Sequence, residues 1–138
     1  MPITTCVFDA YGTLFDVTAA ARQAASEPDF AALRNDWPQD GLDWALEKTG
    51  HDGNAPLRER LLALYWELQA YPEVPEMLQT LKDAGLNTAI LSNGSPAMLQ
   101  GAVDSAGIGG TLDVLLSVET VGVFKPDSRV YDLVGQQF

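Results

Sequence analysis

The sequence predicts an α/β fold, a parallel β-sheet core that carries an insertion made only of helices. Three short apolar runs have the length and composition of buried strands; they are residues 6–8, 88–91 and 112–118. From residue 72 onward, helical patterns alternate with these runs, which is the order expected of parallel strands joined by crossover helices. The tract 17–71 contains helical patterns alone. We therefore predict a core of residues 1–16 and 72–138, with residues 17–71 forming a helical cap.

The composition is typical of a soluble globular protein with a real core. The chain has 138 residues, of which 46% are hydrophobic and 20% charged. A formal net charge of −11 argues against non-specific binding to nucleic acid or to an anionic membrane, and an anionic substrate would need a local cation. Cys6 is the single cysteine, so no intrachain disulfide can form. Neither a signal-peptide pattern nor a membrane-spanning run is present, and we expect a cytoplasmic protein.

The segment Thr4–Asp16, TTCVFDAYGTLFD, contains the first predicted strand and the first candidate site residue. Asp9 directly follows the apolar run Cys6–Phe8, and Gly12 marks the turn after it. Ligands of open α/β sheets bind at the carboxyl ends of the strands, which makes Asp9 a candidate functional carboxylate. An Asp in this place can also simply cap the next segment, and for an isolated strand end that is the more common case.

The tract 17–71 is predicted to be helical with three interruptions, at residues 26–28, 34–41 and 50–54. An Ala-rich helical pattern covers residues 17–33 and is broken at 26–28, which include a proline. Residues 34–41 have the composition of a turn, and a short helix is expected over 42–48. A stronger helix is predicted over 56–70, where leucines and a tyrosine recur at helical spacing.

The later helices have clear start and stop signals. Pro75 suits the first turn of one helix, and Gly85 suits the position just after its end. Ser95 followed by Pro96 is a favourable start for the next helix, with serine as the cap. A last helix is expected over Ser128–Gln136.

The predicted topology gathers polar side chains at one edge of the sheet, because parallel strands all end on the same side. The candidates in these loops are Asp9, Tyr11, Thr13, Ser92, Asn93 and Lys125. Each has an ordinary alternative as a packing, turn, capping or solvated side chain. Together they fit a site in which an ionised carboxylate acts as a nucleophile, a neighbouring ammonium favours its charged form, and hydroxyls and amides orient an anionic substrate.

Three segments of the sequence resemble the motifs of the haloacid dehalogenase superfamily in the same order. They are FDAYGTLFD at residues 8–16, LSNGS at 91–95, and Lys125-Pro126. The resemblance spans nearly the whole chain and implies a Rossmann-like core with a cap. Phosphatases of the superfamily carry an Asp two residues after the nucleophile, close to a bound Mg²⁺, whereas this chain has Tyr11 there. Together with the segment KPDSRVY at 125–131, this is similar to the L-2-haloacid dehalogenases.

The resemblance implies a metal-independent hydrolysis of short 2-haloalkanoates. Asp9 would attack the halogen-bearing carbon, expel halide with inversion and form an ester, which water would then hydrolyse to a D-2-hydroxy acid. Lys125 would keep Asp9 ionised, and Thr13 would orient one of its oxygens. A single carboxylate beside a lysine does not make a Mg²⁺ site, and no other cofactor is implied.

The same resemblance implies roles for four further residues and for a partner. Ser92 and Asn93 would hold the substrate carboxylate, and Tyr11 would line the apolar side of the pocket. Tyr131 resembles a family position that is needed for activity. The substrate and the halide ion are the expected small-molecule partners, and a homodimer is possible because dimers are common among the resembling proteins.

Two parts of the family pattern have no counterpart in this sequence. The cap arginine that binds the substrate carboxylate is not matched, since residues 34–41 (RNDWPQDG) have a different pattern and a shortened cap is expected there. The sequence ends at Phe138, before the family's next strand and its water-positioning motif, so we expect a missing C-terminal segment. Two alternatives therefore stay open, a phosphatase-like enzyme and a non-catalytic fragment of the same fold.

Overall fold

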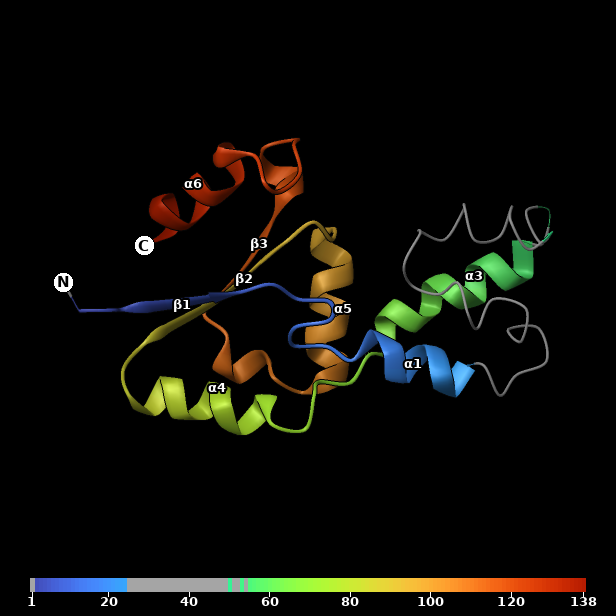
Figure 1. Ribbon diagram of the computed structural model, residues 1–138, viewed down its shortest axis with the longest axis horizontal. Coiled ribbons are helices and arrows are strands. Elements are labelled where there is room, and N and C mark those ends of the chain that lie inside the picture. The colour runs from blue at the N-terminus through green and yellow to red at the C-terminus, as the bar shows by residue number, and fades with distance from the viewer. Residues whose placement is uncertain (1, 25–49, 51–52, 54) are drawn as a thin grey trace.

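A computed structural model describes residues 2–24, 50, 53 and 55–138 (Figure 1). Its core is a parallel sheet of three strands, β1 (Thr5–Phe8), β2 (Asn87–Ser92) and β3 (Val114–Ser117), in the order β1-β2-β3. Phe8 pairs with Ile90, and Ile90 pairs with Leu115. The predicted α/β class and the parallel sheet are confirmed. The predicted turn at 34–41 and helix at 42–48 lie outside the described residues.

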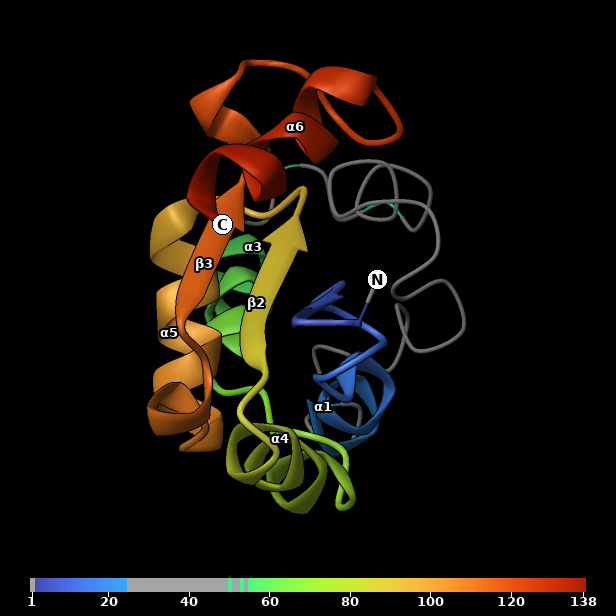
Figure 2. The ribbon, with the colours of Figure 1, turned by 90° about the vertical axis from the view of Figure 1, so that its left-hand side faces the viewer.

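Helices cover both faces of the sheet. Helices α4 (Val74–Asp83) and α5 (Pro96–Ala106) lie over one face, and α6 (Ser128–Gln137) lies over the other, as Figures 1 and 2 show from two sides. Neighbouring residues of β2 point to opposite faces. Ile90 therefore packs in the cluster that contains α4 and α5 residues, and Leu91 packs with the buried residues of α6. Both sides of the central strand are buried, as its continuous apolar run predicts.

The helix signals in the sequence have the expected structural roles. Gly85 adopts a positive φ of 78° after α4, where its amide donates to the carbonyl of Lys82. The amide of Leu86 donates to the carbonyl of Leu81 at 3.1 Å, which completes a Schellman motif. At the start of α5, the Ser95 hydroxyl accepts from the Met98 amide at 3.3 Å. These local bonds set where each helix meets its strand.

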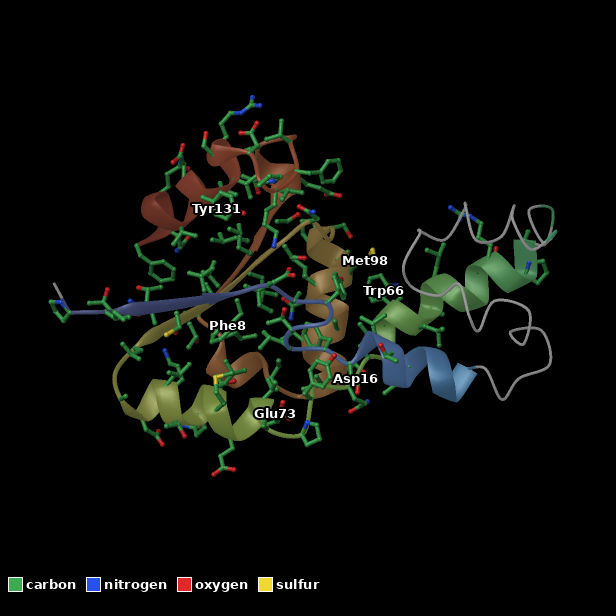
Figure 3. All side chains as sticks on the ribbon, viewed as in Figure 1. Phe8, Asp16, Trp66, Glu73, Met98 and Tyr131 are labelled. Atoms are coloured by element: carbon green, nitrogen blue, oxygen red, sulfur yellow. The ribbon has the colours of Figure 1, made fainter. Side chains whose placement is uncertain are left out.

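The described helices of the tract 17–71 lie to the right of α5 in Figure 1, away from the sheet. They are α1 (Val17–Ala24) and α3 (Ala55–Ala63), followed by the short 3₁₀ helix η2 (Leu64–Trp66). One of the described contacts between this tract and the core is that of η2 with α5. Figure 3 shows Trp66 and Met98 at this junction. A Cβ on Gly101 would overlap the Trp66 ring, so this close contact requires a glycine.

The predicted helix over 56–70 was too long, because α3 ends at Ala63 and η2 ends at Trp66. The backbone beyond η2 is needed for pairing with the first loop. The carbonyl of Gln69 accepts from the Asp16 amide at 2.9 Å, and the Tyr71 amide donates to the Leu14 carbonyl at 3.0 Å. Ala70 forms an isolated antiparallel bridge with Phe15 here, which helical backbone cannot form. None of the described helices is long and apolar enough to cross a membrane.

An ion pair joins α4 to the strands at the end of the sheet opposite Asp9. The Lys82 ammonium lies 2.6 Å from one oxygen of Asp113, and the same oxygen accepts from the Thr88 amide at 2.7 Å. The hydrogen bond from Lys82, and then that from the Thr88 amide, lower the pKa of Asp113 below its ordinary value of 3.8. A carboxyl whose pKa falls on folding adds stability above its unfolded pKa, and that stability is lost as the pH drops through the folded pKa.

We expect Asp113→Asn to lower the free energy of unfolding at pH 7 by about 1 kcal/mol, a value kept small because the pair is partly exposed. The difference from the unsubstituted protein should shrink as the pH falls below 3.8. Urea unfolding at several pH values measures both effects. Asp132→Asn, which removes the same charge from an exposed site on α6, is the control and should show neither. A difference that is independent of pH would contradict the assignment.

Candidate active site

The three strands end at one edge of the sheet, and the predicted site residues lie at these strand ends and in the loops that follow, except Tyr131, which lies on α6. Asp9 follows β1, Ser92 ends β2 and Ser117 ends β3. Ser92 and Ser117 are register partners, and the arrowheads of β2 and β3 point the same way in Figure 2. This is the edge at which open α/β sheets bind ligands.

Asp9 and Lys125 form the charged centre of this edge. The Lys125 ammonium lies 3.0 Å from Asp9 Oδ1 and donates to the Leu91 carbonyl at 2.9 Å. The Ala10 amide also donates to Oδ1, at 2.8 Å. Asp9 Oδ2 accepts no hydrogen bond from the described residues, and half of the Asp9 side chain is exposed. The carboxylate is therefore held by one oxygen and presents the other to a reactant.

The loop that carries Lys125 is fastened to β2 at a second point. The Lys125 amide donates to Asn93 Oδ1 at 3.0 Å. Just beyond the loop, Asp127 caps α6 by accepting from the Arg129 amide. The Arg129 guanidinium beside this carboxyl lowers the pKa of Asp127 to about 2. The Lys125 ammonium is thus held by its own contacts with Asp9 and Leu91. The backbone of the loop is held by Asn93 and by the capped start of α6.

A pocket of about 280 Å³ lies beside Asp9 and Lys125. Apolar side chains from β1, β2 and α6 make up most of its wall, together with Tyr131; the lining residues are Val7, Phe8, Asp9, Leu91, Lys125, Tyr131 and Val134. Figure 3 labels Tyr131 on α6 and Phe8 on β1, two of the elements that line the pocket. The pocket brings together three of the seven predicted site residues.

The Ser92 side chain hydrogen-bonds to a backbone group of its own loop, and the Asn93 side chain to a backbone group of the Lys125 loop. Ser92 is 1% exposed, and its hydroxyl accepts from the Gly94 amide at 3.0 Å. Asn93 is exposed, and its Oδ1 is used by Lys125. Their predicted contact with a substrate carboxylate stays a prediction. In the structure these side chains shape the loop and position Lys125.

Tyr11 and Thr13 occupy the turn after Asp9. The Tyr11 ring lies 6.2 Å from that of Phe15, centroid to centroid, and its hydroxyl oxygen is shielded from solvent. Thr13 is exposed, and its amide donates to the Ala10 carbonyl at 3.2 Å. Thr13 was predicted to orient one Asp9 oxygen, and Oδ1 is held by the Ala10 amide and Lys125. A role for the Thr13 hydroxyl also stays a prediction.

Sequence reasoning missed one polar residue at this edge, Ser117. Its side chain is buried, donates to the Gly94 carbonyl at 2.7 Å and accepts from the Glu119 amide at 3.2 Å. No motif marks it. Its place near the end of the third apolar run, residues 112–118, was the only signal that could have identified it.

The described residues include no group of three histidine, cysteine, aspartate or glutamate side chains placed to hold a metal ion. At the Asp9 centre the charged groups are one carboxylate and one ammonium. Such a pair can support a nucleophilic displacement, in which the carboxylate attacks and the ammonium stabilises negative charge.

Comparison with protein families extends these observations to the whole chain. The family model described as haloacid dehalogenase-like hydrolase matches residues 3–138. (S)-2-Haloacid dehalogenase 1 of Pseudomonas sp. (strain CBS-3) is 39% identical over an alignment of 155 positions. The alignment covers 94% of this chain and 68% of that protein.

Solved structures agree with the sequence comparison. A crystal structure of a dehalogenase matches 98% of this chain and 71% of its own, with a TM-score of 0.87 and 34% identity. L-2-Haloacid dehalogenase from Xanthobacter autotrophicus, solved with chloropropionic acid covalently bound, matches 99% of this chain and 65% of its own, with a TM-score of 0.86 and 30% identity. The chain thus spans roughly two thirds of the length of each of these proteins.

Proposed function

The chain belongs to the haloacid dehalogenase-like hydrolases, and on this premise we propose that it hydrolyses the carbon–halogen bond of short L-2-haloalkanoic acids to give D-2-hydroxy acids. The observation that carries the proposal is the 3.0 Å contact between Asp9 and Lys125 at the mouth of a largely apolar pocket. The similarity to (S)-2-haloacid dehalogenases supports the same reaction class. In this proposal residues 17–71 act as a helical cap on the core of residues 1–16 and 72–138.

The first step is a displacement at C2 of the substrate. Asp9 Oδ2 is the attacking oxygen, because Oδ1 is occupied by the Ala10 amide and the Lys125 ammonium. The new carbon–oxygen bond forms as the carbon–halogen bond breaks, the halide leaves with its electron pair, and the configuration inverts. A halide needs no proton to leave, so the step requires no general acid. The covalent chloropropionic acid in the Xanthobacter autotrophicus protein supports a covalent intermediate of this kind.

The second step hydrolyses the resulting ester. Water attacks the carboxyl carbon of Asp9, and the bond between this carbon and Oδ2 breaks. Oδ2 leaves as the hydroxyl oxygen of the D-2-hydroxy acid. The carboxylate of Asp9 is restored and one proton passes to solvent. The Lys125 ammonium and the Ala10 amide stabilise the negative charge that develops on Oδ1 during this attack.

In this proposal the remaining predicted residues bind the substrate or orient Asp9. Lys125 supplies the local cation that an anionic substrate needs on a chain with a net charge of −11. Ser92 and Asn93 hold the substrate carboxylate, with the Asn93 amide nitrogen as donor because its oxygen is used by Lys125. Tyr11 lines the apolar side, Thr13 orients Asp9, and Tyr131 contributes to the pocket wall.

The residue two positions after Asp9 favours this function over phosphate-ester hydrolysis. In the phosphatases that the sequence resembles, that position is an Asp that protonates the leaving alcohol close to Mg²⁺, and here it is Tyr11. A tyrosine packed against Phe15 adds no carboxylate to the site. We therefore propose that catalysis is independent of metal ions.

Halide release from L-2-chloropropionate tests the proposal. We expect turnover in the presence of EDTA, with no gain on adding Mg²⁺ and no release from the D enantiomer. p-Nitrophenyl phosphate with Mg²⁺ serves as the alternative substrate. Hydrolysis of the phosphate ester without halide release would identify a phosphatase. Failure with both substrates would favour the non-catalytic alternative.

A further inference from the structure

We propose that Ser117 and Gly94 are positioning residues that hold Tyr11 in place and thereby set how tightly the substrate is bound. The proposal rests on the proposed function, in which Tyr11 lines the substrate site. It concerns a row of contacts that crosses all three strand ends, from Ser117 at the end of β3, through Gly94 after β2, to Tyr11 after β1.

The Gly94 peptide is held on both sides by buried hydroxyls. Its amide donates to Ser92 Oγ at 3.0 Å, and its carbonyl accepts from Ser117 Oγ at 2.7 Å. Ser92 is 1% exposed and Ser117 is 4% exposed. Hydrogen bonds in a buried setting are costly to break, because the separated groups are left without water. The position of Gly94 relative to the sheet is therefore well defined.

Tyr11 lies directly against this glycine. A Cβ added to Gly94 would sit 2.8 Å from Tyr11 Cε2 and 3.0 Å from the Tyr11 hydroxyl oxygen. Both distances are far below ordinary contact between heavy atoms. The Tyr11 ring also packs against Phe15, at a tilt of 45°. Glycine is required here because of this close approach, since Gly94 does not have a positive φ.

These contacts are separate from those that hold the charged centre. Lys125 is fastened by the Leu91 carbonyl and by Asn93 Oδ1, and neither atom belongs to Gly94 or Ser117. A change at Ser117 or Gly94 should therefore move the substrate-facing ring while leaving the attack by Asp9 intact. The kinetic signature is a raised KM with an unchanged kcat.

Two substitutions test the row from opposite directions. Ser117→Ala removes a donor without adding bulk, and we expect a KM for L-2-chloropropionate raised about 5-fold. Gly94→Ala pushes a methyl group into the Tyr11 ring, and we expect a KM raised roughly 10-fold. In both variants kcat should stay within about 2-fold of the unsubstituted value. Ser117→Thr, which keeps the hydroxyl, should restore KM.

A double substitution and a control identify Tyr11 as the residue through which these changes act. In a Tyr11→Ala background, Gly94→Ala should have no further effect on KM, because the ring it displaces is gone. Thr88→Val removes another buried hydroxyl, which donates to the Thr111 carbonyl at 2.5 Å at the far end of β2. That variant should lose stability with KM unchanged.

A spectroscopic measurement makes the test independent of turnover. The measurement is fluorine NMR of protein labelled with 3-fluorotyrosine, in which the Tyr11 resonance is identified by its loss in Tyr11→Phe. Its chemical shift should change in Ser117→Ala and in Gly94→Ala. It should stay the same in Thr88→Val. An unmoved resonance, a kcat effect without a KM effect, or a Gly94→Ala effect that persists without Tyr11 would overturn the proposal. If the unsubstituted protein releases no halide, the proposed function fails, and the resonance still decides whether Ser117 and Gly94 position Tyr11.

Discussion

Replacement of Asp9 by Asn is expected to lower halide release from L-2-chloropropionate by at least ~10³-fold, because an amide cannot form the ester. The substitution is nearly isosteric. The amide oxygen of an asparagine can still accept from the Ala10 amide and from Lys125, the two donors to Asp9 Oδ1. We therefore expect a folded protein whose chemical step alone is lost, as measured by halide release under single-turnover conditions with circular dichroism as the check on folding.

The matched control is Asp16→Asn, a change of the same type seven residues later in the same segment. Asp16 caps α1 by accepting from the Ala19 amide at 2.8 Å, and asparagine is an equally good cap. That variant should retain halide release. A single turnover in water labelled with heavy oxygen adds a direct readout, since the first product should carry unlabelled oxygen from Asp9. Labelled oxygen in that product, or an active Asp9→Asn variant, would mean that water attacks the substrate directly.

Local sequence patterns predicted the strands and the charged centre well. A short apolar run followed by a polar residue identified both β1 with Asp9 and β2 with Ser92, and the parallel topology brought Lys125 to the same edge. Glycine and serine signals marked the ends of α4 and the start of α5, because they act through bonds within a few residues. The sequence therefore predicts most of what depends on neighbours along the chain.

Features that depend on distant segments could not be predicted in this way. Residues 69–71 were predicted to be helical, but they pair with the loop after β1, some fifty residues earlier in the chain. Ser117 bonds to Gly94, and Asn93 bonds to the Lys125 amide, across 23 and 32 residues respectively. A serine near the end of an apolar run has no property in the sequence that distinguishes a structural hydroxyl from one that shapes a site.

The Lys125 ammonium is the second group on which the proposed reaction depends. Among the residues that the structure describes, it is the cation that contacts Asp9. Because its side chain is only 21% exposed, water screens its attraction for negative charge only weakly. We expect Lys125→Met to lower kcat/KM for L-2-chloropropionate by roughly 10²-fold to 10³-fold, the loss that follows removal of one donor aimed at developing charge. Steady-state halide release measures it.

The loop should survive this substitution, because the backbone amide of residue 125 still donates to Asn93 Oδ1. Lys125→Arg is not expected to restore activity, since a planar guanidinium cannot take the place of a compact ammonium between Asp9 and the Leu91 carbonyl. The control is Lys82→Met, which removes an equally well-formed ion pair with Asp113 at the opposite end of the sheet and should reduce stability without changing kcat/KM. Equal losses of activity in Lys125→Met and Lys82→Met would mean that Lys125 acts only through folding, whereas a loss confined to Lys125→Met assigns it to the reaction at Asp9.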